Sequence, residues 1–596
     1  MSSSTQTVYR GASFLIESHC PDDVFTPEDF TEEQEMIGRT AEQFMENEVV
    51  PRIQQLEEKV GGINEVLLRK AAEIGLVGAS IPEEYGGLGL DQISATIISE
   101  KTGRYGSFAT TFGAHTGIGT LPILYFGTEE QKRRYLPKLC SAEWIAAYAL
   151  TEADSGSDAL NAKSTATLNA EGTHYVLNGT KMWITNAGFA DVFIVFAKVN
   201  GEHFTGFIVE RSFSGISTGD EEHKMGIHGS STRSLVLQDA RVPIENVLGE
   251  VGKGHKIAFN ILNFGRLKLG ASVVMGVRYV ADTAVRYANE RRQFGKVIGE
   301  FGAIQHKLAE MAVQIFCAES MVYRTAGMID RVFAGIDKRS PTASAETLVA
   351  LEDFVVECSI IKVANSEILD LVVDEAVQIH GGYGYSQEYP VERAYRDARI
   401  NRIFEGTNEI NRLLITGQLL KRAMKNQLAL IPAAQKVAAE LTSFQSLEEN
   451  ETGELASEFH ILANIKKLFL LSAAAAVQKF REELGNQQEL LMLLSDLVIA
   501  IYSLECMLLR IQKGLLRQGQ KKWAIPLQAA TVLAHTQLFK AENIAKQVFC
   551  ATSEGDELRV QFAALRRFTK STPIDLISLR RHIAQQLRLH NSSSLL

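Results

Sequence analysis

The sequence predicts a mainly α-helical protein with one small β domain at its centre. Apolar residues recur at helical spacing before about residue 147 and again after about residue 249, whereas the intervening stretch holds short runs rich in β-forming residues. A length of 596 residues allows about three to four domains. We expect helical domains at 27–147 and 249–425, a β domain at 148–248 between them, and an additional helical domain at 426–596.

Capping residues and apolar spacing predict the helices of the first domain. Thr26 reads as an N-cap, because Pro27 follows at the first helical position and the acids Glu28 and Asp29 fall in the first turn. Apolar residues then recur at helical spacing, at Ile63, Val66, Leu67, Ala71, Ile74 and Leu76. Three glycines, Gly86, Gly87 and Gly89, indicate a loop after this helix.

The β domain is predicted from runs that Asn, Gly and Ser separate. They are HYVLNG, KMWITN, DVFIVFAKV, FTGFIVER and SLVLQDARV. So many short strands within about a hundred residues favour a small antiparallel barrel or sandwich.

Helical spacing returns after residue ~250, with long segments at Arg278–Glu290 and Glu346–Ile379. Beyond Leu420 the chain stays helical and rich in Ala, Leu and Gln, and the polar stretch Ser446–Glu458 is expected to be a linker. No uninterrupted apolar run approaches the roughly 20 residues that span a bilayer. The most apolar stretch, Leu468–Val477, is interpreted as a buried helix.

Composition narrows the possible functions. A net charge of −10 and a pI near 5.8 argue against nucleic acid as a partner, since that partner needs a basic face. The cysteines lie far apart with no C-x-x-C pair, so we expect neither a metal site nor a disulfide framework. The N-terminal residues resemble neither a signal peptide nor a transit peptide, and we therefore expect a cytoplasmic protein.

Several nucleotide-binding and hydrolase motifs are missing from the sequence. It has no G-x-G-x-x-G after a strand and no G-x-x-x-x-G-K-[ST]. H-E-x-x-H and G-x-S-x-G are missing too. A Rossmann dehydrogenase, a P-loop NTPase, a zincin and an α/β-hydrolase are therefore disfavoured.

Three segments instead carry a specific resemblance. They are YALTEADSGSD with NGTKMWITNAGFAD, then NERRQFGKVIGEFGAIQHKLAEM, and finally QIHGGYGYSQEYPVERAYRDARINRIFEGTNEI. In this order and spacing, over residues ~30–420, they resemble the acyl-CoA dehydrogenase family. The resemblance implies an N-terminal helical domain, a β-barrel and a C-terminal four-helix bundle, with an extra helical domain behind them.

Desaturating a thioester requires a base for the α-proton and an acceptor for the β-hydride. The resemblance implies that FAD is the acceptor, through flavin N5, and that the base is Glu405 of the E-G-T element. An apolar pocket closed by substrate would raise the pKa of this carboxylate towards the working pH. In one branch of the family the base precedes an Arg on another helix, but Gly265 occupies that position here, before Arg266.

The resemblance also assigns the flavin and substrate contacts. The strands against the isoalloxazine supply Tyr148, Leu150, Thr151, Trp183, Ile184 and Thr185, with the Thr185 hydroxyl towards N5. Elements that serve the FAD diphosphate and adenosine, in part from a neighbouring subunit, supply Arg291, Gln293, Phe294, Gln378, Gly381, Gly382, Thr407 and Glu409. The implied substrate-binding residues are Ser157 near the pantetheine, Arg266, Gly406, Ala109 and Gly113.

Within the family the chain most resembles the very-long-chain branch. Gly302 in EFGAIQ, the ILNFGR segment and the long helical C-terminal addition are typical of that branch. We therefore expect a homodimer that acts on long-chain acyl-CoA and passes electrons to an electron-transfer flavoprotein. Ala433–Leu441 is only mildly amphipathic, so we expect at most weak peripheral membrane contact. Two alternatives stay open: an oxygen-using acyl-CoA oxidase, and an assembly scaffold for respiratory complexes.

Overall fold

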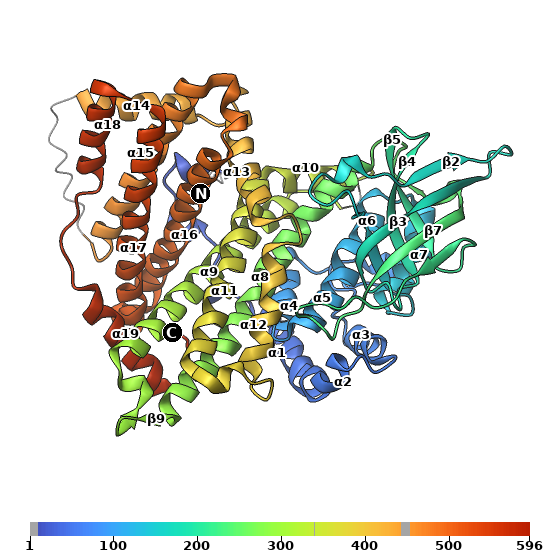
Figure 1. Ribbon diagram of the computed structural model, residues 1–596, viewed down its shortest axis with the longest axis horizontal. Coiled ribbons are helices and arrows are strands. Elements are labelled where there is room, and N and C mark those ends of the chain that lie inside the picture. Colours follow the sequence, from blue (N-terminus) through green and yellow to red (C-terminus); the bar gives the residue numbers. More distant parts are fainter. Residues whose placement is uncertain (1–9, 339, 443–452) are drawn as a thin grey trace, which may run out of the picture.

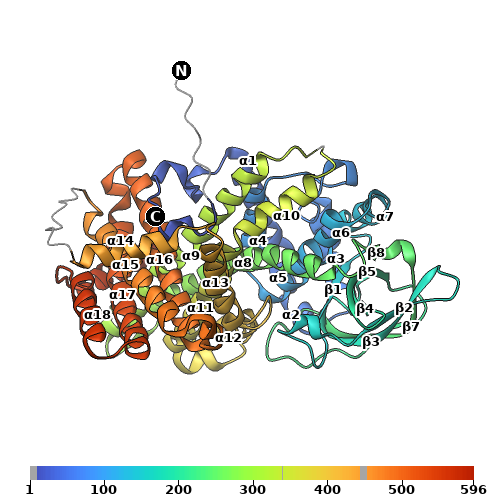
Figure 2. The same ribbon diagram turned by 90° about the horizontal axis from the view of Figure 1, so that it is seen from above.

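The computed structural model describes residues 10–338, 340–442 and 453–596. The strands lie at one end of the molecule, the long bundle helices in the middle and the C-terminal helices at the other end (Figure 1). The same order is visible from above in Figure 2. The predicted fold class, mainly helical with a central β domain and extra C-terminal helices, is confirmed.

The N-terminal part is helical. Its α-helices are α1 (Glu32–Phe44), α2 (Ile53–Glu57), α3 (Ile63–Glu73), α4 (Gln92–Thr102), α5 (Gly106–Gly113), α6 (Leu121–Phe126) and α7 (Glu129–Cys140). The cap predicted at Thr26 is present, but it opens only a short 3-10 turn, Pro27–Asp29. The backbone turns extended at Phe30, and Thr31 then caps α1 by accepting a hydrogen bond from Gln34 N at 3.2 Å.

The strands form one eight-stranded sheet in the order β6-β7-β3-β2-β4-β5-β8, with β1 also beside β4. They are β1 (Ala146–Ala149), β2 (Thr165–Leu168), β3 (His174–Thr185), β4 (Val192–Val199), β5 (His203–Glu210), β6 (Ile216–Thr218), β7 (Thr232–Pro243) and β8 (Val247–Leu248). The sheet is mixed, not wholly antiparallel as expected, because β1 and β2 both run parallel to β4. The chain leaves the sheet after β1 and returns in the same direction as β2.

β4 joins the sheet to the helices. Its alternate residues Val192, Ile194 and Phe196 belong to the large helical core, whereas Phe193 and Val195 lie in the core of the sheet itself. Because successive side chains of a strand point to opposite faces, a strand covered on both faces is apolar throughout. This explains why DVFIVFAKV shows no alternation of polar and apolar residues.

Long helices form the bundle after the sheet. They are α8 (Gly254–Glu290), α9 (Gly302–Ala334), α10 (Ala343–Asp353), α11 (Val355–His380), α12 (Pro390–Ala398) and α13 (Asn408–Met424). A small hairpin of β9 (Arg292–Gln293) and β10 (Lys296–Val297) joins α8 to α9. The helix expected over Glu346–Ile379 breaks at Phe354, whose side chain is buried and whose N–H bonds to Leu351 O.

The C-terminal helices cover one side of this bundle. They are α14 (Leu430–Thr442), α15 (Ala456–Phe480), α16 (Gln488–Gln518), α17 (Gln520–Thr552), α18 (Gly555–Phe568) and α19 (Leu576–His590). α16 packs against α9 and α13, and α19 also packs on α9. The expected linker lies mostly outside the described residues, and α15 begins within its last positions, at Ala456.

Two C-terminal stretches, Ala456–Asn486 and Gln488–Gln518, are long and apolar enough to cross a membrane by length and composition. Charged residues interrupt both stretches, so the absence of an apolar run of about 20 residues still holds. In the second stretch 83% of the most apolar window is buried inside the protein. A core helix passes the same test, so hydropathy alone gives no reason to place either helix in a membrane.

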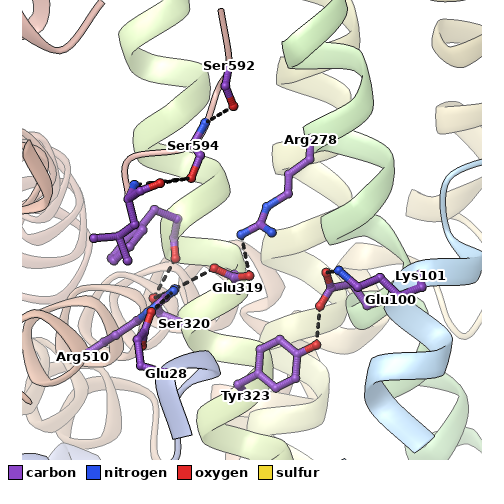
Figure 3. A network of polar contacts seen from close by, with 12 residues as sticks. Glu28, Glu100, Lys101, Arg278, Glu319, Ser320, Tyr323, Arg510, Ser592 and Ser594 are labelled. Atoms are coloured by element: carbon purple, nitrogen blue, oxygen red, sulfur yellow. Dashed lines mark hydrogen bonds and ion pairs between the residues drawn. The ribbon is translucent and has the colours of Figure 1, made fainter. Parts of the chain in front are cut away.

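Buried ion pairs connect the three helical regions (Figure 3). Glu319 on α9 accepts from Arg278 of α8 at 2.5 Å and from Arg510 of α16 at 2.8 Å. Arg510 also binds Glu28, which belongs to the N-terminal turn. Each charge has an opposite partner here, the condition under which ionised groups tolerate burial.

Candidate active site

Glu405 lies in the short loop between α12 and α13, and its backbone is left-handed. Its φ is 58°, and Gly406 follows with a φ of 82°. Glycine adopts this conformation freely, but a residue with a side chain is strained there, and such residues concentrate at functional sites. Two left-handed residues in succession turn the chain sharply just before α13 begins.

Three side chains hold this loop by donating to its carbonyl oxygens. Asn411 Nδ2 donates to the carbonyls of Glu405, Gly406 and Thr407 at 3.3, 2.8 and 3.1 Å. Lys362 Nζ, from α11, donates to Gly406 O at 2.7 Å. Arg266 Nε, from α8, donates to Glu405 O at 3.4 Å. Strain at Glu405 is therefore offset by hydrogen bonds from two bundle helices and from α13 itself.

The Glu405 carboxylate points at the backbone of α8. A Cβ atom on Gly265 would lie only 2.5 Å from Glu405 Oε2, so glycine leaves the space that the carboxylate fills. Oε2 is buried and has no hydrogen-bond partner. Burial raises the pKa of Glu405 to about 7, although the positive charges of Arg266 and Lys362 act to lower it. This is the environment that the sequence predicts for a base.

A cavity of about 130 Å³ borders Glu405. Its wall includes four of the predicted site residues, Glu405, Thr185, Ala109 and Gly113, which come from three separate regions of the chain. Gly113 faces open space, since no heavy atom lies within 4 Å of the position that a Cβ would take. The structure thus brings together the predicted base, a flavin residue and both residues predicted for the acyl pocket.

Near the end of β3, Trp183 presents an exposed aromatic side chain. The pairing of β3 with β7 shifts register between Lys181 and Ile184, and Trp183 there has a φ of 61°. Its side chain is 56% exposed, whereas the neighbouring Ile184 is buried in the sheet. Opposite, Met182 N donates to Thr151 O at 2.9 Å, which fixes the chain just after β1.

Tyr148 on β1 is buried, and its hydroxyl has no hydrogen-bond partner. Burial raises its pKa well above the usual value, and the negative charge of Glu405 adds to this effect. Leu150 and Thr151 follow at the start of the loop that leaves the sheet. A buried pair between Lys181 Nζ and Glu152 Oε1, at 2.6 Å, holds the base of that loop, and Ser157 lies exposed further along it.

A second set of predicted residues gathers elsewhere, around a surface groove of about 660 Å³. Arg291, Gln293, Gly381 and Gly382 line it, and the Arg291 guanidinium lies 5.2 Å from the centre of the Tyr383 ring. Figure 1 shows β9, which holds Gln293, at the lower end of the bundle, away from the strands that carry Trp183. Within one chain, the two sets do not form one site.

The remaining predicted residues lie at the edges of these two places. Phe294 is 92% exposed and has a φ of 50°, and Gln378 is exposed near the end of α11. Thr407 caps α13, since its Oγ1 accepts from Ile410 N at 3.3 Å. Glu409 is exposed on the first turn of α13 and lines neither cavity.

Sequence reasoning missed Lys362 and Lys268. Lys362 lies on a different helix from the E-G-T element, and no local spacing links the two. Lys268 follows Gly265 by one helical turn on α8 and lines the cavity, where an apolar residue would be the ordinary choice. Asn411 could have been inferred, because it follows Thr407 by four residues, within reach of the start of its own helix.

The residues present fit FAD. An exposed indole at Trp183 and a buried Tyr148 hydroxyl without a partner suit a flat heteroaromatic ring, and both lie on strands that end beside the Glu405 cavity. In the second groove Arg291 supplies a fixed cation for phosphate, while the backbone at Gly381 and Gly382 is uncovered by any heavy atom within 4 Å of a Cβ position. No group of three or more His, Cys, Asp or Glu residues within the described ranges is placed to hold a metal ion.

The chain is similar in sequence to known proteins. Family models for the N-terminal, middle and C-terminal domains of acyl-CoA dehydrogenases match residues 31–143, 147–240 and 252–420, and a further acyl-CoA dehydrogenase C-terminal model matches 464–567. A probable acyl-CoA dehydrogenase of Bacillus subtilis is 48% identical over 98% of both chains. The mitochondrial very long-chain specific acyl-CoA dehydrogenase of Rattus norvegicus is 36% identical over 81% of this chain and 74% of its own length.

A solved structure extends the likeness to three dimensions. The acyl-CoA dehydrogenase complexed with FAD from Bacillus anthracis superposes with a TM-score of 0.96 at 48% identity, over 98% of this chain and 100% of that one. Sequence, fold and the residues around Glu405 therefore lead to the same conclusion: the chain belongs to the acyl-CoA dehydrogenase family and is an FAD-dependent oxidoreductase.

Proposed function

We propose that this acyl-CoA dehydrogenase introduces a trans-2 double bond into long-chain acyl-CoA, with Glu405 as the base that takes the α-proton. One observation carries the proposal: the Glu405 side chain borders the cavity, and its carboxylate oxygen Oε2 accepts no hydrogen bond from the described residues. No protein donor therefore competes there with the substrate proton. A pKa of about 7 lets the group accept the proton and release it again near neutral pH.

Residues of the protein set the charge and the position of Glu405 for the proton transfer. Arg266 and Lys362 favour the ionised carboxylate before the proton moves, while burial favours the neutral acid afterwards. The hydrogen bonds that Asn411 and Lys362 donate to the loop fix the orientation of Glu405. The side chain therefore needs little reorientation before it takes the proton. Bound FAD supplies the acceptor for the hydride that leaves the β-carbon. We propose that the electrons then pass to an electron-transfer flavoprotein.

Small residues in the cavity wall support the preference for long chains. Ala109 and Gly113 leave the cavity open where larger side chains would fill it, and nothing lies within 4 Å of a Cβ position on Gly113. Each methylene buried there is worth about 0.8 kcal/mol. We propose a preference for acyl chains of roughly C12 or longer, the property named for the very long-chain relatives.

Two sets of flavin residues that lie apart in one chain support a homodimer, in which Arg291, Gln293 and Phe294 serve the flavin of the partner. The C-terminal helices support a dimer over a tetramer, because α16 covers α9 and α13 on the surface that two dimers would otherwise share. For α14, Val437 is buried against α15. Since this apolar face is already used, we propose at most weak peripheral contact with membranes for a cytoplasmic protein.

The test is anaerobic flavin bleaching by palmitoyl-CoA, followed in wild type and Glu405→Gln. The amide keeps the volume but is not basic, so the variant should bind FAD and acyl-CoA yet reduce flavin about a hundred- to ten-thousand-fold more slowly. Glu489→Gln is the matched control, an exposed acid on the first turn of α16 outside the site, and should keep most activity. Near wild-type bleaching by Glu405→Gln would disprove the role of the base. Peroxide formed in air faster than an electron-transfer flavoprotein is reduced would instead identify an oxidase.

A further inference from the structure

Lys268 is a partly buried cation in the wall of the active-site cavity. It follows Gly265 by one turn of α8, and so faces the same side of the helix as the glycine that accommodates Glu405. Its Nζ donates one hydrogen bond, to Thr116 O at 3.1 Å. Among the described residues no carboxylate pairs with it, and Thr116 O is its one hydrogen-bond acceptor.

Several buried cations in the described part of the chain pair with a carboxylate, although buried Lys362 donates only to Gly406 O and Asn408 Oδ1. Lys181 pairs with Glu152 at 2.6 Å, and Lys513 pairs with Asp29 at 2.5 Å. Arg510 pairs with Glu319 at 2.8 Å. An ionised group without a counter-ion is costly to bury, and burial accordingly lowers the pKa of Lys268 to about 8. The ammonium is still the main form at neutral pH.

Lys268 borders two cavities. With Ser99, Phe112 and Thr116 it also lines a smaller neighbouring cavity, which neither Glu405 nor Thr185 borders. The lysine stem passes Gly117, where a Cβ would lie 3.5 Å from Lys268 Cδ. The Lys268 side chain therefore forms part of the wall that the active-site cavity shares with this smaller one.

Five of the hydroxyl groups that line the two cavities already donate to the backbone. Each of these hydroxyls donates its hydrogen to a carbonyl of its own helical segment. The residues are Ser99, Thr102, Thr110, Thr116 and Ser272. An anion in this part of the cavity would find a charged donor in Lys268. A terminal methyl group would instead lie against a partly buried charge.

We propose that Lys268 binds the terminal carboxylate of the substrate, so that the preferred substrates are mono-CoA esters of α,ω-dicarboxylic acids. The inference rests on the proposed function, because it concerns the far end of the same acyl chain. The carboxylate supplies a counter-ion and accepts hydrogen bonds from Nζ. The thioester end meanwhile remains at Glu405.

Binding can be measured without turnover in the Glu405→Gln background. Isothermal titration calorimetry would compare dicarboxylic mono-CoA esters with methyl-terminated acyl-CoAs over a series of matched lengths. We expect one or two lengths at which the carboxylate-terminated ester binds about ten- to a hundred-fold more tightly, the range of a charge-assisted hydrogen bond. Lys268→Met should reverse this preference, weakening the carboxylate ester and tightening the methyl-terminated one. Lys268→Arg should keep the preference in part.

The controls separate this inference from a fold defect and from the proposed function. Lys256→Met, on an exposed face of α8, should leave the preference unchanged. Lys268→Met should unfold at the same temperature as the parent or higher, because it removes a partly buried charge. Equal affinities for both ester series, or a preference that survives Lys268→Met, overturn the inference even if wild type bleaches with methyl-terminated substrates. If none of the acyl-CoA esters bleaches the flavin of the wild-type enzyme, the proposed function is contradicted. The binding preference can still be measured by calorimetry in that case.

Discussion

Lys362 Nζ lies 2.7 Å from the carbonyl oxygen of Gly406, the residue that directly follows the proposed base. The same ammonium donates to Asn408 Oδ1 at 2.7 Å. One buried side chain therefore fixes the left-handed turn at Gly406 and the first residue of α13. Its charge also acts on Glu405, whose pKa it lowers. Position and protonation of the base thus depend on a residue of another helix.

Replacing Lys362 by Met should slow flavin reduction about a hundred-fold, because a misplaced catalytic group loses that much rate. Loss of the positive charge should also move the limb of the pH–rate profile to higher pH, an effect that a purely structural role would not produce. Lys362→Arg should restore the limb in part. Stopped-flow reduction across pH measures both effects, with the exposed Lys425→Met as control. An unshifted limb in Lys362→Met would contradict the electrostatic role.

The raised pKa of Glu405 predicts the pH dependence of the reaction. The base acts as a carboxylate, so flavin reduction in the free enzyme should rise with pH through about 7 and then level off. The same shift affects stability with a defined sign. A carboxyl whose folded pKa is raised stabilises the fold below its unfolded pKa of 4.5, and this contribution is lost as pH rises through about 7.

Glu405→Gln should therefore gain stability relative to wild type as pH rises from about 5 to about 8. Thermal unfolding of both proteins over this range measures the difference. A constant gap between the two unfolding temperatures would show that the Glu405 carboxyl titrates at an ordinary pKa.

Gly265→Ala should displace the base without removing it. The new Cβ would lie 2.5 Å from Glu405 Oε2, closer than atoms approach, so the carboxylate must move. We expect flavin reduction to fall about a hundred-fold, with FAD content maintained. Gly417→Ala, at an exposed position of α13 outside the cavity, is the matched control, since its Cβ meets nothing within 4 Å. Equal rates for the two variants would show that the carboxylate tolerates the methyl group.

Gly113→Glu should shorten the preferred acyl chain. A large polar side chain at this position would occupy the cavity that Gly113 leaves open. Each methylene excluded removes about 0.8 kcal/mol of binding, so the longest substrates lose most. Steady-state rates across saturated acyl-CoA lengths measure the shift, and a wild-type optimum at roughly C4 to C8 would refute the long-chain proposal.

The position of Arg291 predicts the oligomeric state of the protein. Light scattering should give a homodimer, and Arg291→Ala should lower FAD content because a fixed cation for phosphate is lost. The exposed Arg559→Ala, on α18, serves as the control. A clean tetramer would show that α16 does not block the second surface. A monomer with full flavin content would show that each chain completes its own site.

The sequence by itself determined the family and the order of helical and β regions, and it singled out Glu405 as the proposed base, because these depend on local motifs and on apolar periodicity. It also placed the N-cap at Thr26, where short-range hydrogen bonds decide the outcome. It did not determine the parallel pairing of β1 and β2 with β4, since pairing depends on where the chain returns after an excursion from the sheet.

Tertiary structure alone decided which residues surround the base. Lys362, Gly265 and Glu405 lie on three separate segments, and only the packing of α8, α11 and the loop before α13 brings them together. The same packing places Lys268 beside the cavity, with no carboxylate partner among the residues that the structure describes. Burial and charge pairing are properties of the space between elements. For this reason the raised pKa of Glu405 and the placement of the Lys268 ammonium become visible only in the folded chain.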